Sequence, residues 1–588
     1  MTLKKISILL LIFLSINFAL NLYGINWGLP SRWHSDERVT DVLHMAERRS
    51  LVDVDNEFFE QTGYQLLLLI WFIPLFALLK LFHYPFDQLK EAASVSWHHM
   101  ASLFPSFATN IYIYARILSA VTGVITVYLI YLLGKEIYNK KIGLFSAAFL
   151  SVCMGFVGIN HLAKYASFLN LLIVLTLFFS VKGSFCLAFF FAGLTFSVHS
   201  NGLLLLLPLL LAIIFNSVNL RRAAFVFTKS IPLYLGGILL GTPSLITNFG
   251  EYFLKFKILF KSFFSVKQIN YVHPVSEILD SLFTGPINYF FEIWSVTGIL
   301  IFALILIGIA VTINRWRGIS KKEVIIYSFI ILNYFTVAVL FESNLPSQKF
   351  IIGIVPLLFL FAGRAMFEIF EEKKISIYFR QAIFFLIFIY SFAYTFKGDL
   401  VFAREDTRYE STNWVLKNVP KGSKIELFDQ IHYVCSDEIM NYYEIIYLGR
   451  STADFKGERF FKWNKVEGRD EYFQFINRHD SSSDYIIIDI DDINKIYSPN
   501  YMSHIPGLAK YLKDLFGHKK NFKLIKVFQS KNQPIASKKI KGVVYPSSLW
   551  WDPIPVSREV SPTIYVFKNM DSNAASYDGL RYAKDIYQ

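Results

Sequence analysis

The sequence predicts a polytopic α-helical membrane protein that ends in an extracytoplasmic α/β domain. The 588 residues are 54% hydrophobic and 17% aromatic, with a mean hydropathy of +0.41. Many hydrophobic segments approach the roughly 20 residues that a helix needs to cross a bilayer. Beyond Lys397 the sequence becomes polar, and its hydrophobic runs shorten to strand length. A bilayer-spanning portion followed by a soluble domain accounts for both kinds of composition.

The charge of the chain reports first on membrane topology. The formal net charge is +13, but the basic residues form no compact patch, so no nucleic-acid partner is expected. In membrane proteins, Lys and Arg concentrate in cytoplasmic connections. Lys4 and Lys5 precede the first hydrophobic run, which lacks a clear small-residue cleavage site. We expect this run to be an uncleaved anchor with its N-terminus in the cytoplasm.

The connection Gly134–Lys141 decides how the first segments are placed. It is basic, so it is predicted to be cytoplasmic. Residues 63–82, which contain Pro74, are then expected to lie at the outer interface or to re-enter, because a crossing there would put this connection outside. We predict 11 spans, at about residues 6–22, 111–133, 142–160, 168–182, 184–198, 202–216, 230–247, 287–312, 324–341, 350–367 and 376–396.

Two domains follow from this pattern. Residues 1–397 form the predicted transmembrane domain, with a first outer loop at 24–110 that carries the candidate catalytic residues, and residues 398–588 form the extracytoplasmic domain. In the second domain, strand-like runs such as Tyr485–Ile488 and Ile564–Phe567 alternate with helical stretches. The expected location is the plasma (inner) membrane, with the N-terminus in the cytoplasm and the C-terminal domain outside.

Polar side chains gather at the predicted outer ends of the spans instead of at the midplane. A cation at the level of the lipid headgroups suits a lipid phosphate, and a neighbouring carboxylate suits a general base. Together they describe a site that takes a sugar from a lipid phosphate and gives it to a nucleophile outside the cell. The catalytic candidates are Asp36 and Glu37, the candidates for donor-phosphate binding are Arg116, His161, Lys164, His199 and Lys349, and His34 is placed near the substrate.

Each of these residues also has a purely structural interpretation. Ser35 is a good N-cap, and acidic residues in a first helical turn favour the helix dipole. Arg116, Lys164 and Lys349 could anchor the chain at the interface, and His199 could be a hydrogen-bonded packing residue. No certain cofactor is predicted. A divalent metal stays open, but no all-protein metal cage is visible in the sequence.

Several short motifs occur in an order that resembles the GT-C membrane glycosyltransferases. Within them, the chain is most similar to the group that contains protein O-mannosyltransferases and lipid A aminoarabinose transferases. Each motif is weak alone, and their shared order carries the resemblance, which covers most of the membrane portion and the start of the tail. The motifs are Gly28–Pro30 with His34–Glu37, Ala115–Ala120, Gly193–Thr195 with Asn201–Leu203, Gly241–Pro243, and the tail segment Asp406–Arg408 with Trp414, Asn418–Pro420 and Gly422.

The resemblance implies a polyprenyl-phosphate-linked sugar donor, transfer on the extracytoplasmic face, and inversion at the anomeric carbon. It also implies that Asp36 is the leading candidate for the base. The chain departs from the group's pattern at three positions. Ala166 stands where many members have a second Asp, His199 stands where a Lys is expected, and Lys349 with Phe350 replaces an Arg-Tyr pair.

The sequence therefore predicts an integral-membrane glycosyltransferase with Asp36 as general base. Its partners would be the lipid-linked sugar donor, membrane lipids, and an acceptor that is a protein, a lipid or a glycan. Two alternatives stay open. One is a lipid or glycan transporter or flippase, which usually shows internal repeats or polar groups at the midplane. The other is a non-catalytic scaffold that keeps the GT-C fold.

Overall fold

A computed structural model describes the parts of the chain from which the fold is built. The described residues separate into two compact units, one ending at Ala403 and the other beginning at Arg404. The predicted membrane and extracytoplasmic assignments of 1–397 and 398–588 stay predictions. The described residues are 3–29, 37, 39, 42, 62–81, 104–247, 249–250, 253, 278–340, 351–427, 434–447, 483–489, 514–516, 521–529, 538–540, 543–545 and 562–571.

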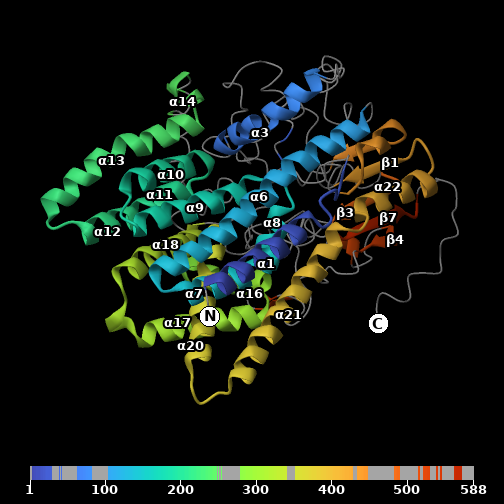
Figure 1. The fold of residues 1–588 in the computed structure, drawn as a ribbon. Coiled ribbons are helices and arrows are strands. Elements are labelled where there is room, and N and C mark those ends of the chain that lie inside the picture. Colours follow the sequence, from blue (N-terminus) through green and yellow to red (C-terminus); the bar gives the residue numbers. More distant parts are fainter. Residues whose placement is uncertain are drawn as a thin grey trace. The chain divides into compact units, whose positions relative to one another are not determined.

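The first unit is helical (Figure 1). Apolar segments of this length become helices in a bilayer because a helix satisfies its own backbone hydrogen bonds. The elements are α1 (Leu3–Leu22), α3 (Thr62–Leu81), α6 (Pro105–Ile137), α7 (Lys140–Ser151), α8 (Met154–Asn160), α9 (Tyr165–Val181), α10 (Phe185–Val198), α11 (Asn201–Leu204), α12 (Leu206–Asn216), α13 (Leu220–Gly241), α14 (Ser244–Thr247), α16 (Ile278–Thr297), α17 (Ile299–Asn314), η2 (Trp316–Gly318), α18 (Lys321–Leu340), α20 (Val355–Glu371) and α21 (Ile377–Phe402).

Four of the described helices are long and apolar enough to cross a membrane, namely those that begin at Pro105, Leu220, Lys321 and Ile377. The number is five if α7 and α8, which bend by 63°, form one span. The protein is therefore a multi-pass membrane protein. Each of the 11 predicted segments overlaps at least one helix, but the count of 11 spans stays a prediction.

Four predicted spans are interrupted in the structure, and two of them are the segment 202–216, which divides at Leu205, and the segment 230–247, which divides at Thr242 and Pro243. The segment 142–160 divides into α7 and α8 at Val152 and Cys153, and the segment 287–312 divides into α16 and α17 at Gly298. Gly298 has a φ of +75°, which a residue with a side chain rarely adopts. By contrast, the described part of the predicted segment 63–82 lies in one continuous helix, α3 (Thr62–Leu81), which includes Pro74. Its position at the outer interface stays a prediction.

Helix α6 lies at the centre of the first unit. It packs against α1, α7, α8, α9 and α20, and Figure 1 shows it beside α1 and α9. Small residues allow close approach elsewhere in the unit. A Cβ atom at Gly237 would collide with the carbonyl oxygen of Phe190, and one at Gly193 would collide with that of Tyr234, so α10 and α13 touch along their backbones.

Ionic side chains form two layers at opposite ends of α6. The first contains Arg116 and is called the Arg116 layer. The second contains Glu136 and is called the Glu136 layer. These residues are twenty positions apart, or about 30 Å along a helix, close to the thickness of the hydrocarbon core. The Glu136 layer contains the ion pairs Lys322–Glu136 at 2.6 Å, Lys141–Glu371 at 2.8 Å and Arg315–Glu368 at 2.8 Å, and also the pair Arg364–Glu323.

The Glu136 layer joins connections that the sequence predicted to be cytoplasmic. Lys141 follows α6, Arg315 follows α17, Lys322 lies in the first turn of α18, and Glu371 ends α20. Their ion pairs bring these basic connections to one end of the unit. That grouping is the one the predicted topology requires, although the orientation of the chain in the membrane stays a prediction.

The second unit contains a mixed five-stranded sheet with the strand order β2-β1-β3-β7-β4. β1 pairs in parallel with β2 and β3, whereas β7 runs antiparallel to β3 and β4. Helix α22 packs against β4 and β7. The elements are α22 (Thr407–Asn418), β1 (Lys424–Leu427), η4 (Asp437–Asn441), β2 (Glu444–Tyr447), β3 (Tyr485–Asp489), β4 (Phe522–Phe528), the separate pair β5 (Lys538–Ile540) and β6 (Val543–Tyr545), and β7 (Ile564–Asn569).

The predicted α/β character of the tail is thus confirmed. The two strand-like runs recognised in the sequence become β3 and β7, and they are neighbours, with Ile487 opposite Val566. The motif at the start of the tail has a capping role. The carboxylate of Asp406 accepts a hydrogen bond from the backbone N–H of Arg408 at 2.9 Å and so begins α22.

Candidate active site in the Arg116 layer

A buried ion pair between Glu37 and Arg116 is the centre of the candidate site. Nε of Arg116 donates to Oε1 of Glu37 at 2.8 Å, and Nη2 donates to Oε2 at 2.7 Å. Nη1 donates to the carbonyl oxygens of Ile25 at 2.7 Å and Trp27 at 2.8 Å. Both charged residues are fully buried. The bidentate geometry and the two carbonyls compensate the guanidinium for the water it has lost.

Glu37 also binds the turn that follows α8. The backbone N–H of Ala163 donates to Oε1 of Glu37 at 2.8 Å. Its single carboxylate therefore connects Glu37 both to α6 and to the turn before α9. The sequence placed Glu37 and Arg116 at the same membrane surface but did not predict that they pair, because 79 positions separate them.

His161, at the start of the same turn, pairs with a carboxylate that the sequence analysis missed. Nε2 of His161 lies 3.1 Å from Oδ1 of Asp399, and the imidazole stacks on Phe402 with ring centroids 4.4 Å apart. Both members of the pair are buried. Within the described part of the chain, Nδ1 of His161 and Oδ2 of Asp399 have no hydrogen-bond partner.

Asp399 lies in the last turn of α21, beyond the predicted span 376–396. Its position 238 residues after His161 hid the pairing from any local pattern. One signal was available in the sequence. A lone carboxylate that continues an apolar helix is expensive to bury, so it is expected to have a partner.

Lys164 and His199 lie at the other end of the same turn, where α9 begins. Lys164 is the N-cap residue of α9 and is 8% exposed. His199 follows α10 and stacks on the ring of Tyr165, with centroids 5.6 Å apart. Nδ1 of His199 accepts the backbone N–H of Asn201 at 3.3 Å. Residues 161–165 are called the hub turn below. His161 contacts Asp399, Ala163 contacts Glu37, and Tyr165 contacts His199.

The remaining predicted site residues lie outside the described part of the chain. These are His34, Asp36 and Lys349. Across the described ranges, no group of three or more His, Cys, Asp or Glu side chains is arranged to hold a metal ion. A divalent metal at the site stays a prediction.

In comparisons with known proteins, one family model matches the part of the chain that contains Arg116 and the hub turn. Residues 97–246 match the model of the family described as Dolichyl-phosphate-mannose-protein mannosyltransferase. The resemblance that the sequence motifs suggested is thereby confirmed over this part of the chain. The matched segment includes Arg116, the hub turn and His199. None of the curated proteins compared with the chain matches it.

Two solved structures are similar to the chain at low identity. ArnT from Cupriavidus metallidurans bound to undecaprenyl phosphate shares 10% identity with a TM-score of 0.45, covering 98% of this chain and 100% of that one. The Archaeoglobus fulgidus oligosaccharyltransferase tethered with an acceptor peptide shares 12% identity with a TM-score of 0.46, covering 97% of this chain and 89% of that one.

Proposed function

We propose that the protein is an integral-membrane glycosyltransferase that moves a sugar from a polyprenyl-phosphate-linked donor to an acceptor on the extracytoplasmic side. The observation that supports this most directly is the concentration of ionic groups around the hub turn, inside the segment that matches a family of lipid-phosphate-dependent mannosyltransferases. Neither the sugar nor the class of acceptor is specified by these residues.

The environment of Glu37 favours Asp36 as the general base. Both carboxylate oxygens of Glu37 accept hydrogen bonds from Arg116, and Oε1 also accepts one from Ala163. These donors occupy both oxygens of a fully buried side chain, so Glu37 has little access to a proton on an acceptor. Asp36 is bonded to Glu37, and consecutive Cα atoms lie about 3.8 Å apart. Fixing Glu37 therefore restricts the position of Asp36, so we assign Asp36 as base and Glu37 as the residue that positions it.

In the proposed reaction, Asp36 removes a proton from the acceptor as that acceptor attacks the anomeric carbon of the sugar. The bond between this carbon and the donor phosphate oxygen breaks, and the polyprenyl phosphate leaves with the electron pair. Attack opposite the leaving group inverts the anomeric carbon. Cationic groups that face the leaving phosphate stabilise its developing charge.

Lys164, His161, His199 and Lys349 are the residues we propose for the donor phosphate. Arg116 is on the same list, but four of its hydrogen bonds already go to Glu37, Ile25 and Trp27. Its guanidinium has five N–H donors in all. We therefore propose that Arg116 acts mainly through Glu37 and offers the phosphate at most its remaining N–H.

Two substitutions test the division of roles between the adjacent carboxylates. Asp36→Asn removes a general base, so transfer should fall by about 10² to 10⁴-fold while thermal stability is retained. Glu37→Gln leaves Arg116 buried without its counter-charge, and the loss of one member of such a pair costs about 3–5 kcal/mol. Glu37→Gln should therefore lower the midpoint of thermal unfolding as well as transfer.

The readout begins with mass spectrometry of lipids, glycans and proteins from a deletion strain, which identifies the product that loses a sugar. Purified variants are then assayed for that product from a lipid-linked sugar, with Glu405→Gln, an exposed carboxylate, as control. Wild-type turnover in Asp36→Asn would exclude Asp36 as base. Flux of the lipid-linked sugar across liposomes without transfer would support the flippase alternative, and absence of both activities would support a scaffold.

A further inference from the structure

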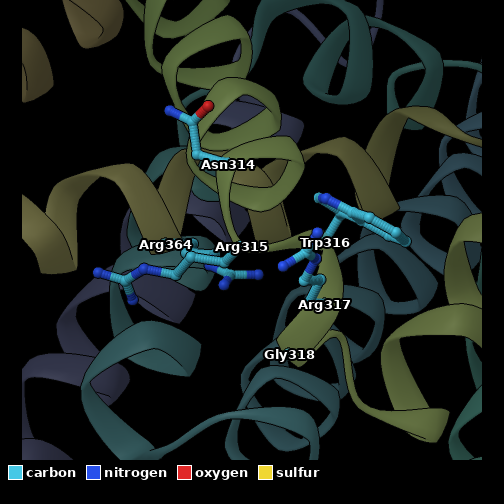
Figure 2. Close-up of a pocket in the computed structure, with 6 residues that line it drawn as sticks. All are labelled: Asn314, Arg315, Trp316, Arg317, Gly318 and Arg364. Atoms are coloured by element: carbon cyan, nitrogen blue, oxygen red, sulfur yellow. The ribbon is translucent and has the colours of Figure 1, made fainter.

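A basic pocket lies at the other end of the helical unit, in the Glu136 layer. Its volume is about 640 Å³, and it is lined by Asn314, Arg315, Trp316, Arg317, Gly318 and Arg364. In the view of Figure 2, the Arg315 side chain lies between that of Arg364 on one side and those of Trp316 and Arg317 on the other. Half of the lining residues are arginine, and none is acidic. We call this feature the Arg317 pocket.

Two of the three arginines are partly neutralised by carboxylates. Arg315 forms a bidentate pair with Glu368, at 2.8 and 2.9 Å. Nη1 of Arg364 donates to Glu323 and, at 3.2 Å, to Oγ1 of Thr312. These hydrogen bonds of each guanidinium use only some of its five N–H donors, and they also hold the side chain in place. These two residues therefore offer pre-positioned donors with little net charge.

Arg317 supplies the positive charge that is not balanced. Its guanidinium lies over the ring of Trp316, 5.6 Å from the centroid. Among the described residues, no carboxylate pairs with it. A pocket that contains two compensated guanidiniums and one uncompensated guanidinium carries a net charge near +1. An anion with several acceptor oxygens matches this arrangement, because guanidinium groups bind phosphate through parallel N–H donors.

The edge of the pocket is apolar and exposed. Trp316 is 65% exposed, and Ile313, one turn earlier, is 62% exposed. Exposed tryptophan beside aliphatic residues at the end of a membrane helix is typical of the bilayer interface. A soluble phosphate would make no use of this edge. A phospholipid would use both parts, with its phosphate among the arginines and its glycerol and upper acyl chain against Trp316 and Ile313.

We propose that the Arg317 pocket binds the phosphate group of an anionic phospholipid in the leaflet at the Glu136 layer. Under the predicted topology this is the cytoplasmic leaflet, which carries a negative surface potential. The site is about 30 Å along α6 from the Arg116 layer. It therefore does not depend on the proposed glycosyl transfer, and the two can fail separately.

The test is lipid retention by the purified full-length protein in native mass spectrometry. The probes are phosphatidylglycerol and phosphatidylcholine of matched chain length, with inorganic phosphate as a soluble competitor. The wild type should retain phosphatidylglycerol preferentially. Arg317→Gln should weaken this retention by about tenfold, which corresponds to 1.4 kcal/mol. Trp316→Leu should produce a smaller loss, because it keeps the apolar contact but removes the ring under the guanidinium.

The matched control is Lys373→Gln with Lys374→Gln, which removes two exposed charges from the turn after α20 in the same layer. The control should retain the lipid like the wild type, and both variants should unfold at the wild-type temperature. Equal losses in Arg317→Gln and the control would mean general charge attraction and would overturn the proposal. Equal retention of the two lipids, or displacement by millimolar inorganic phosphate, would overturn it too.

Discussion

Asp399 supplies a carboxylate that the family pattern places elsewhere. Ala166 occupies the position where a second Asp was expected, yet a buried Asp reaches the same turn from α21 and binds His161. A carboxylate on Nε2 fixes the orientation of an imidazole. The free Nδ1 edge can then present either a lone pair or an N–H to a ligand. We therefore propose Asp399 as a positioning residue for His161.

This role predicts that the two substitutions will not be additive. Asp399→Asn and His161→Gln should each reduce transfer, by about 10 to 100-fold as for other residues that orient a functional imidazole. The double variant should be no worse than the more impaired single variant, because residues in one unit share one effect. Transfer assays of the three proteins measure this. Independent, multiplicative losses would show that Asp399 acts on something other than His161.

At this scale the sequence predicted which residues belong together but not how they pair. Glu37, Arg116, His161 and Lys164 were assigned to one membrane surface from span parity alone, and the structure describes all four around the hub turn. The pairing could not be predicted, because every contact joins segments at least 79 positions apart. Local patterns such as the acidic turn after Ser35 describe capping preferences and carry no information about distant partners.

At the scale of elements, the backbone contact between α10 and α13 predicts different stability effects for Ala at two adjacent glycines. Gly237 is buried against Phe190, whereas a Cβ atom at Gly236 would have nothing within 4 Å. Gly237→Ala should separate the two helices and cost about 1–3 kcal/mol. Gly236→Ala, one position away on the same helix, should be neutral or slightly stabilising, because Ala favours helix over Gly.

Thermal unfolding of the two variants in one detergent measures the difference. The pair controls for the chemistry of the substitution, since both replace Gly with Ala in α13. An equal effect at both positions would show that helix propensity, and not the contact with α10, determines the outcome.

The helices themselves were predictable because the bilayer leaves an apolar segment few alternatives. The interruptions were not. The bend between α7 and α8 and the break at Gly298 depend on neighbours such as Val296 and Tyr394, which contact Gly155 and Gly298 from other helices. In the second unit, the strand pattern predicted β3 and β7 but not their order in the sheet. Parallel and antiparallel pairing depends on crossovers that local alternation does not encode.

For the whole molecule, the three cysteines provide a test of topology in the native sequence. Cys153 and Cys435 are buried, whereas Cys186 is exposed at the start of α10. Burial raises the pKa of the Cys435 thiol, in the second unit, to about 12. A raised pKa favours the neutral thiol, so at pH 7–8 Cys435 is protonated and unreactive, and reactivity would increase only as the pH approaches that value. Labelling of the folded protein should therefore occur at Cys186.

The predicted topology places Cys186 at the cytoplasmic end of its helix, beside Lys182, and places the second unit outside. A membrane-impermeant maleimide should then fail to label the protein in intact cells and should label it after permeabilisation. Lys421→Cys, which adds an exposed thiol in the second unit, should be labelled without permeabilisation. Peptide mapping distinguishes the two positions. Labelling of Cys186 in intact cells would show that the chain has the opposite orientation in the membrane. The proposed site at Glu37, Arg116 and the hub turn would then face the cytoplasm.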